Sequence, residues 1–142
     1  MLIKRKKILK KIALISFFTF TATIYLNNIT RDIYSGDLGD LVTAANVFGV
    51  AHPPGYPLLT LSGFILSLLP LPIPPVSKVA LVSIISSLTA LYLFYKFYIK
   101  ETKNFFISLL STSILAFSYM FWFFTEIPEV FALNNFFIIA LF

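Results

Sequence analysis

The 142-residue sequence contains no cysteine, one histidine and few charged residues. Without cysteine, neither a disulfide framework nor a thiolate metal site nor a cysteine nucleophile is available. Charged residues make up 12% of the chain, about half of the roughly 25% found in soluble domains, whereas 58% of residues are apolar. A water-soluble fold could not cover its surface with so few charges, but lipid is a solvent in which Phe, Leu and Ile can face outward. The sequence therefore predicts an all-α, polytopic membrane protein.

The basic residues are unevenly distributed along the chain. Six of the eleven form one cluster near the N-terminus: Lys4, Arg5, Lys6, Lys7, Lys10 and Lys11. The net charge of +5 therefore indicates a membrane orientation signal and no nucleic-acid partner. A cleavable signal peptide would also place a basic head before an apolar run, but no small-residue cleavage site follows, and residues 27–31 are bulky and polar. We therefore expect an uncleaved anchor with a cytoplasmic N-terminus, in a bacterial or archaeal cell membrane.

Three apolar runs are long enough to cross a membrane, and a fourth begins near the C-terminal end of the sequence. A further run at 58–69 would reach only about 18 Å as a helix, against a hydrocarbon core of about 30 Å. If this run stays on the outer side, the lysines after the second span return to the cytoplasm, as the positive-inside rule favours. The single, incomplete membrane domain is then expected to comprise a basic cytoplasmic tail (1–11), span 1 (12–29), an outer loop with membrane-surface helices (30–75), span 2 (76–98), a cytoplasmic loop (99–103), span 3 (104–124) and the start of span 4 (130–142).

The outer loop contains a pair of carboxylates at the start of a predicted helix. Residues 38–48 have apolar side chains at helical spacing, which predicts an amphipathic helix on the membrane surface. Asp37 and Asp40, three residues apart, could both point to one side for acid–base chemistry or metal binding. The structural alternative is that Asp37 caps the helix and Asp40 lies in its first turn. The two interpretations are compatible, because a capping carboxylate still presents its second oxygen to a substrate.

Two further segments of the predicted outer face contain polar residues. His52-Pro53-Pro54-Gly55-Tyr56-Pro57 is rich in residues that fix the backbone without forming helix or strand. Such a loop could position His52 to bind a phosphate or shuttle a proton, or it could be a simple interfacial turn. Glu126 and Glu129 follow the third span. Glu129 directly precedes an apolar run, where an ionisable residue usually faces the protein interior; the alternative is two solvated loop acids.

These motifs resemble one membrane family. Asp37-Leu38-Gly39-Asp40, followed by His52-Pro-Pro-Gly-Tyr-Pro-Leu, is similar to a signature whose commoner form has Asp-Ser-Gly-Glu before the same proline-rich string. The later Trp122 and Glu129-Val-Phe-Ala-Leu resemble the second block of that family. The family is similar to the protein O-mannosyltransferases and, more broadly, to the GT-C glycosyltransferases. Since Asp40 and Leu38 depart from the usual residues, the resemblance leaves open which acid does the chemistry.

The resemblance implies a glycosyltransferase that moves a hexose such as mannose from a polyprenyl-phosphate donor to a hydroxyl acceptor on the outer face. Asp37 would take the hydroxyl proton, since a hydroxyl is a poor nucleophile until a carboxylate accepts it, and Asp40 would bind the acceptor or a divalent metal. His52 and Tyr56 would hold the carrier phosphate, and Glu129 would line the cavity. The chain would be the front end of a longer enzyme, inactive alone. The alternative is a non-catalytic polytopic protein, such as part of a transporter or an assembly subunit.

Overall fold

The computed structural model describes residues 2–34 and 36–142, and all regular structure in these residues is helical. This confirms the predicted all-α class. The helices, in chain order, are α1 (Leu2–Asn28), α2 (Leu38–Val47), α3 (Pro57–Ser67), α4 (Pro75–Thr102), α5 (Phe105–Ala116), α6 (Tyr119–Glu126) and α7 (Val130–Ala140). Helices α1 and α4 are long and apolar enough to cross a membrane, and α5 with α6 forms a third such stretch that is bent by 62°. The protein is therefore a multi-pass membrane protein.

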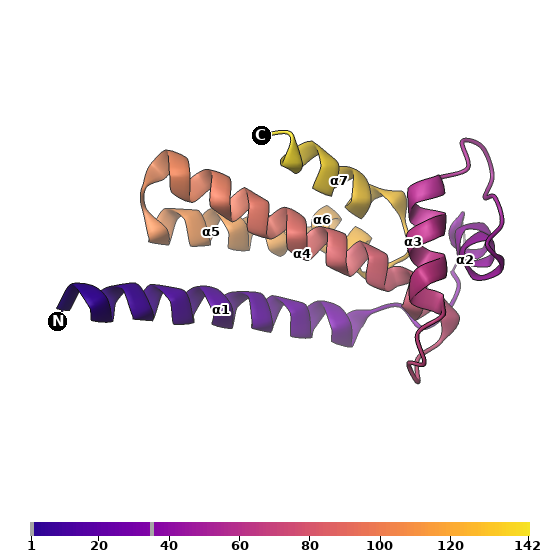
Figure 1. Cartoon of the computed structure of the whole chain (residues 1–142), viewed down its shortest axis with the longest axis horizontal. Coiled ribbons are helices and arrows are strands. Elements are labelled where there is room, and N and C mark those ends of the chain that lie inside the picture. Colours follow the sequence, from indigo (N-terminus) through magenta and orange to yellow (C-terminus); the bar gives the residue numbers. More distant parts are fainter. Residues whose placement is uncertain (1, 35) are drawn as a thin grey trace.

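Helix α4 is the centre of the bundle, with α5, α6 and α7 packed along it (Figure 1). Its buried face is rich in small residues: Ser77, Ala80, Ser83, Ser86, Ser87 and Ala90. Small side chains let helix backbones approach closely, which is how helices associate where lipid removes the hydrophobic driving force. Polar members of this face find partners, since Thr125 of α6 donates its hydroxyl hydrogen to Ser87 Oγ at 2.8 Å.

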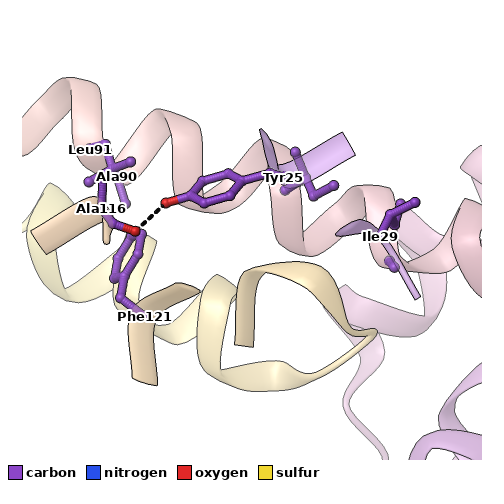
Figure 2. Close-up of a cluster of buried hydrophobic side chains, with 8 residues drawn as sticks. Tyr25, Ile29, Ala90, Leu91, Ala116 and Phe121 are labelled. Atoms are coloured by element: carbon purple, nitrogen blue, oxygen red, sulfur yellow. Dashed lines mark hydrogen bonds between the residues drawn. The ribbon is translucent and has the colours of Figure 1, made fainter. Parts of the chain in front are cut away.

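The third apolar stretch is broken, whereas the sequence predicted one continuous span over 104–124. Hydroxyl side chains in α5 hydrogen-bond to carbonyls four residues earlier, as Thr112 does to Ser108 at 2.7 Å, and this arrangement tends to bend helices. Ser118 then adopts an extended backbone conformation and ends the helical geometry. The carbonyls of a last helical turn lack intrahelical partners. The carbonyl of Ala116 instead accepts a hydrogen bond of 2.7 Å from the buried Tyr25 hydroxyl of α1 (Figure 2).

Helices α2 and α3 lie across one end of the bundle, where α1 ends and α4 begins (Figure 1). The amphipathic helix predicted at 38–48 ends one residue earlier, because Phe48 takes a left-handed backbone conformation (φ 53°). Phe48 is also 61% exposed and so does not belong to the buried face of the helix. At Gly63, α3 approaches its neighbours so closely that an added Cβ would lie 2.9 Å from Ala45 of α2 and 3.0 Å from Val79 of α4. The short run predicted at 58–69 therefore packs across the bundle on both α2 and α4.

A buried threonine joins three segments at this same end. The N–H of Thr30 donates to the carbonyl of Glu126 at 2.9 Å, which connects the residue after α1 to the end of α6. The hydroxyl of Ser77 in α4 donates to the carbonyl of Thr30 at 2.6 Å. The opposite end of the bundle brings together the N-terminal part of α1, the end of α4 and the start of α5 (Figure 1). The acidic loops and the basic segments consequently lie at opposite ends of the molecule.

Candidate functional site

Two carboxylates of the first loop, Asp37 and Asp40, lie beside the ring of His52. Its Nδ1 atom lies 2.7 Å from Asp40 Oδ2, and its Nε2 atom lies 3.5 Å from Asp37 Oδ2. The backbone N–H of His52 also donates to Asp40 Oδ2 at 2.7 Å. The structure thus brings together three of the residues that the sequence singled out and sets the imidazole between two carboxylates.

Asp37 stands at the N-cap position of α2, but its side chain makes no capping hydrogen bond. It is 66% exposed, compared with 49% for Asp40. The capping alternative is therefore right about its position and wrong about its side-chain interaction. Because the carboxylate is neither a cap nor buried, it is available to a molecule arriving from outside.

Asp40 is more fully engaged than Asp37. The backbone N–H of His52 and then its ring hold the pKa of the Asp40 carboxyl below its ordinary value of 3.8. The Nδ1 atom can donate to a carboxylate only when it carries a hydrogen, so this contact favours the Nδ1–H tautomer or the imidazolium. In either form, the orientation of the ring is fixed by Asp40, and Nε2 is turned toward Asp37.

The proline-rich loop holds His52 through a tight turn. The N–H of Gly55 donates to the carbonyl of His52 at 2.7 Å, the Pro53–Pro54 bond is cis, and Gly55 has a φ of 90° that favours glycine. Tyr56 also has a positive φ, 43°, which is uncommon for a bulky residue and marks a position held by its surroundings. Its ring meets that of His52 edge-on, with centroids 5.3 Å apart.

Glu129, from a distant part of the chain, is close enough to this cluster for its charges to act on it, whereas Glu126 has a different partner. Burial raises the pKa of the Glu129 carboxyl above its ordinary value of 4.5, the charge of Asp37 raises it further, and the backbone of Val130 and the charge of His52 act in the opposite direction. Glu129 therefore lies within electrostatic reach of both loop residues. The Glu126 side chain instead accepts a hydrogen bond from the indole of Trp122.

No three His, Cys, Asp or Glu side chains in residues 2–34 and 36–142 are arranged to hold a metal ion. The two carboxylates nearest His52 are directed at its ring from either side.

Two mainly apolar grooves begin at the proline-rich loop. One, of about 470 Å³, runs between Phe48 and Val50 and the loop residues Pro54, Gly55 and Pro57. The other, of about 250 Å³, lies between Tyr56 and the first turn of α3 on one side and α7 on the other. The polar cluster thus stands beside surfaces that suit a hydrocarbon chain.

Sequence reasoning missed the residue that joins these segments. Thr30 connects the end of α1 to α4 and to the end of α6, immediately before Glu129. A threonine next to a span is unremarkable in sequence, and its partners lie far along the chain. No local pattern could have identified it.

A family comparison and two similar proteins point to the same family. A family described as "Protein O-mannosyl-transferase TMEM260 N-terminal domain" matches residues 37–142, beginning at Asp37. The chain is 35% identical over 143 residues to a Dictyostelium discoideum protein named protein O-mannosyl-transferase tmem260, covering 95% of this chain and 17% of that protein. It is 42% identical over 57 residues to a Mus musculus protein named protein O-mannosyl-transferase TMEM260, covering 39% of this chain and 8% of that protein.

No solved structure matches the chain significantly. Both relatives are eukaryotic, so they do not support the expectation of a bacterial or archaeal membrane. The chain spans about a sixth of the length of the Dictyostelium relative. The resemblance to O-mannosyltransferases is confirmed, and the chain belongs to the TMEM260 N-terminal domain family of protein O-mannosyl-transferases.

Proposed function

We propose that this chain contributes the acceptor-activating end of a membrane glycosyltransferase that transfers mannose from a polyprenyl-phosphate donor to a hydroxyl group. In this reaction the acceptor oxygen forms a bond to the anomeric carbon, the bond from that carbon to the phosphate oxygen breaks, and polyprenyl phosphate leaves. The hydroxyl proton passes to a carboxylate of the protein. The observation that carries the proposal is the arrangement of Asp37 and Asp40 on either side of His52.

The two carboxylates have different roles in this proposal. Asp40 is a positioning residue, because its Oδ2 atom is occupied by the backbone N–H and the Nδ1 atom of His52. Asp37 is the base, because its carboxylate is more exposed and free of a capping bond. A proton taken up by Asp37 lies beside His52 Nε2, 3.5 Å away, so the ring can share it.

The donor would lie along the proline-rich loop. Its phosphate is anionic, and His52 and the hydroxyl of Tyr56 are the polar groups that the loop offers to it. Its polyprenyl chain is apolar and would fit the two grooves, which share Pro57 in their lining. Glu129 would close the inner side of this cavity, where burial raises the pKa of its carboxyl.

The proposed reaction takes place on the outer face, with the N-terminus in the cytoplasm. The separation of acidic loops and basic segments to opposite ends of the bundle supports this orientation (Figure 1). If α3 does not cross, the Asp37 loop and Glu129 share one side. In the full-length protein, a membrane-impermeant thiol reagent should label Asp32→Cys and leave Lys100→Cys unlabelled. Labelling of Lys100→Cys from outside would overturn the orientation.

The alternative is a non-catalytic subunit whose loop acids only shape the surface. In a purely structural loop, Asp40 alone would be enough to hold His52. The exposed carboxylate of Asp37, 3.5 Å from the same ring and without a capping bond, would then have no role. The family match, which starts at Asp37, also favours an enzyme.

Sugar transfer from a polyprenyl-phosphate mannose donor, measured with the full-length protein in membranes, tests the proposal. Asp37→Asn should lower the rate about 10²–10⁴-fold, the usual contribution of a general base. Asp40→Asn should lower it less, because the ring of His52 remains but is poorly oriented. Asp32→Asn is the control, since it removes one exposed carboxylate of the same loop outside the cluster.

Unchanged transfer in both the Asp37 and Asp40 variants would refute the catalytic assignment. A loss in His52→Gln greater than that in Asp37→Asn would move the role of base to His52 Nε2, with Asp40 as its orienting carboxylate. Both outcomes are read against the protein level in the membrane, so a folding defect is distinguished from a chemical one.

A further inference from the structure

A mainly apolar groove bordered by lysines lies at the opposite end of the bundle from the acidic cluster. A groove of about 760 Å³ separates the N-terminal part of α1 from the end of α4 and the start of α5. Its polar lining comes from α1 (Lys4, Lys7, Lys10 and Lys11), and the facing wall includes Tyr95 of α4 and Phe105 of α5. The groove is thus basic on one side and aromatic on the other.

The four lysines share one face of α1. Lys4, Lys7 and Lys11 are spaced three and four residues apart, which aligns side chains along a helix. Arg5 and Lys6 belong to the same basic cluster but do not line the groove. An orientation signal depends on the number of positive charges near a span and not on their helical face. The gathering of these lysines around a cavity therefore needs a further explanation.

No carboxylate forms an ion pair with these lysines in residues 2–34 and 36–142. Among the described residues, the ion pairs are those of His52 with Asp37 and Asp40, at the far end of the bundle. One groove lysine faces an aromatic ring, since Lys10 Nζ lies 5.7 Å from the centroid of Phe105. Four positive charges around one groove repel one another, and an anion bound between them would replace this repulsion by attraction.

We propose that this groove binds the phosphate headgroup of an anionic phospholipid of the cytoplasmic leaflet. The lysines would contact the phosphate, and the apolar lining from Ile8, Leu14 and Ile99 would contact the first part of the acyl chains. Basic pockets between helices on the cytoplasmic side are suited to such headgroups, because anionic lipids are concentrated there. A lipid fits better than a protein segment, since the wall is apolar where the span enters the membrane. The site rests on the proposed orientation but is independent of the sugar transfer chemistry.

Native mass spectrometry of the full-length protein in detergent tests the site, with phosphatidylglycerol or phosphatidylcholine as the added probe. The wild type should bind phosphatidylglycerol in preference to phosphatidylcholine. Lys7→Gln/Lys11→Gln should weaken phosphatidylglycerol binding roughly thirtyfold, the expected result of losing two lysine contacts near a membrane surface. Arg5→Gln/Lys6→Gln is the matched control, because it removes the same charge from the same helix outside the groove.

Three results would overturn the proposal. Equal loss in the two double variants would mean general attraction of a basic tail to anionic lipid. Competition by glycerol 3-phosphate as strong as that by the phospholipid would mean a site for a free phosphate ester. No bound phosphatidylglycerol in a wild type that melts normally would mean that another part of the protein fills the groove. Because lipid binding is measured directly, a failure here is distinct from a failure of the proposed transfer activity.

Discussion

The close approach at Gly63 makes the position of α3 directly testable. A methyl group at this position would lie 2.9 Å from Ala45 Cβ and 3.0 Å from Val79 Cγ1. Both neighbours are fully buried, so neither side chain can turn away into solvent. Substitution by alanine must therefore push α3 away from α2, from α4 or from both.

Two opposing contributions determine the effect of Gly63→Ala. Alanine favours a helix over glycine by about 1 kcal/mol, whereas overpacking of a close-packed interior typically costs about 1–3 kcal/mol. With two contacts this short, we expect the free energy of unfolding to fall by roughly 1 kcal/mol. The measurement is unfolding of the full-length protein in mixed micelles by titration with sodium dodecyl sulfate, followed by tryptophan fluorescence.

Gly39→Ala is the control for this substitution. The added methyl group would meet only Ile33 Cγ2, at the ordinary distance of 3.6 Å, within the first turn of α2. It should leave stability unchanged or raise it. If Gly63→Ala were as stable as Gly39→Ala, α3 would not pack on α2 and α4 as described, and the argument that it lies across the bundle would fail.

Three further substitutions probe the bend and the candidate site. Tyr25→Phe removes the donor to the Ala116 carbonyl and should cost about 1–3 kcal/mol in the same unfolding assay, and an unchanged stability would mean that the carbonyl has another donor. His52 lowers the pKa of Asp40, so the stability that Asp40 contributes is present above pH 3.8 and is lost as the pH falls through the lowered pKa. The unfolding midpoint of Asp40→Asn should therefore lack this dependence on acid pH. Because burial raises the pKa of Glu129 above 4.5, the wild type should lose stability as the pH rises through the raised value. Glu129→Gln should be flat over that range, and a parallel decline would place the titration elsewhere.

The sequence predicts the membrane helices and the site residues for reasons that act locally. Apolar length is a property of a continuous segment, so α1 and α4 follow from composition. Asp37 and the proline-rich loop are recognisable because backbone preferences and capping depend on neighbouring residues. These features need no knowledge of the rest of the fold.

Other features depend on contacts between distant residues and were not predicted. Residues 104–124 contain no charged side chain and are mainly apolar, so hydropathy could not show the bend at Ser118, which is accompanied by a hydrogen bond from Tyr25, 91 residues before its acceptor. The sequence indicated both Asp37 and Asp40 but not which one holds His52, because that depends on how the turn at Gly55 directs the ring. Glu129 is brought toward the cluster by the packing of α7 on α4, where the hydroxyl of Ser83 donates to the Glu129 carbonyl at 3.4 Å.

One hydrogen bond of Thr30 can form only late in synthesis, because its acceptor, the carbonyl of Glu126, lies far along the chain. Chains enter the membrane from the N-terminus onward, so α1 and the loop with Asp37, Asp40 and His52 are made long before Glu126. Until the bent third span has been inserted, the N–H of Thr30 has no carbonyl of Glu126 to bond to, and Glu129 is absent from the cluster. The first loop can form its own aspartate–histidine contacts early. During synthesis, the nascent protein therefore passes through a stage in which the first loop is present without Glu129.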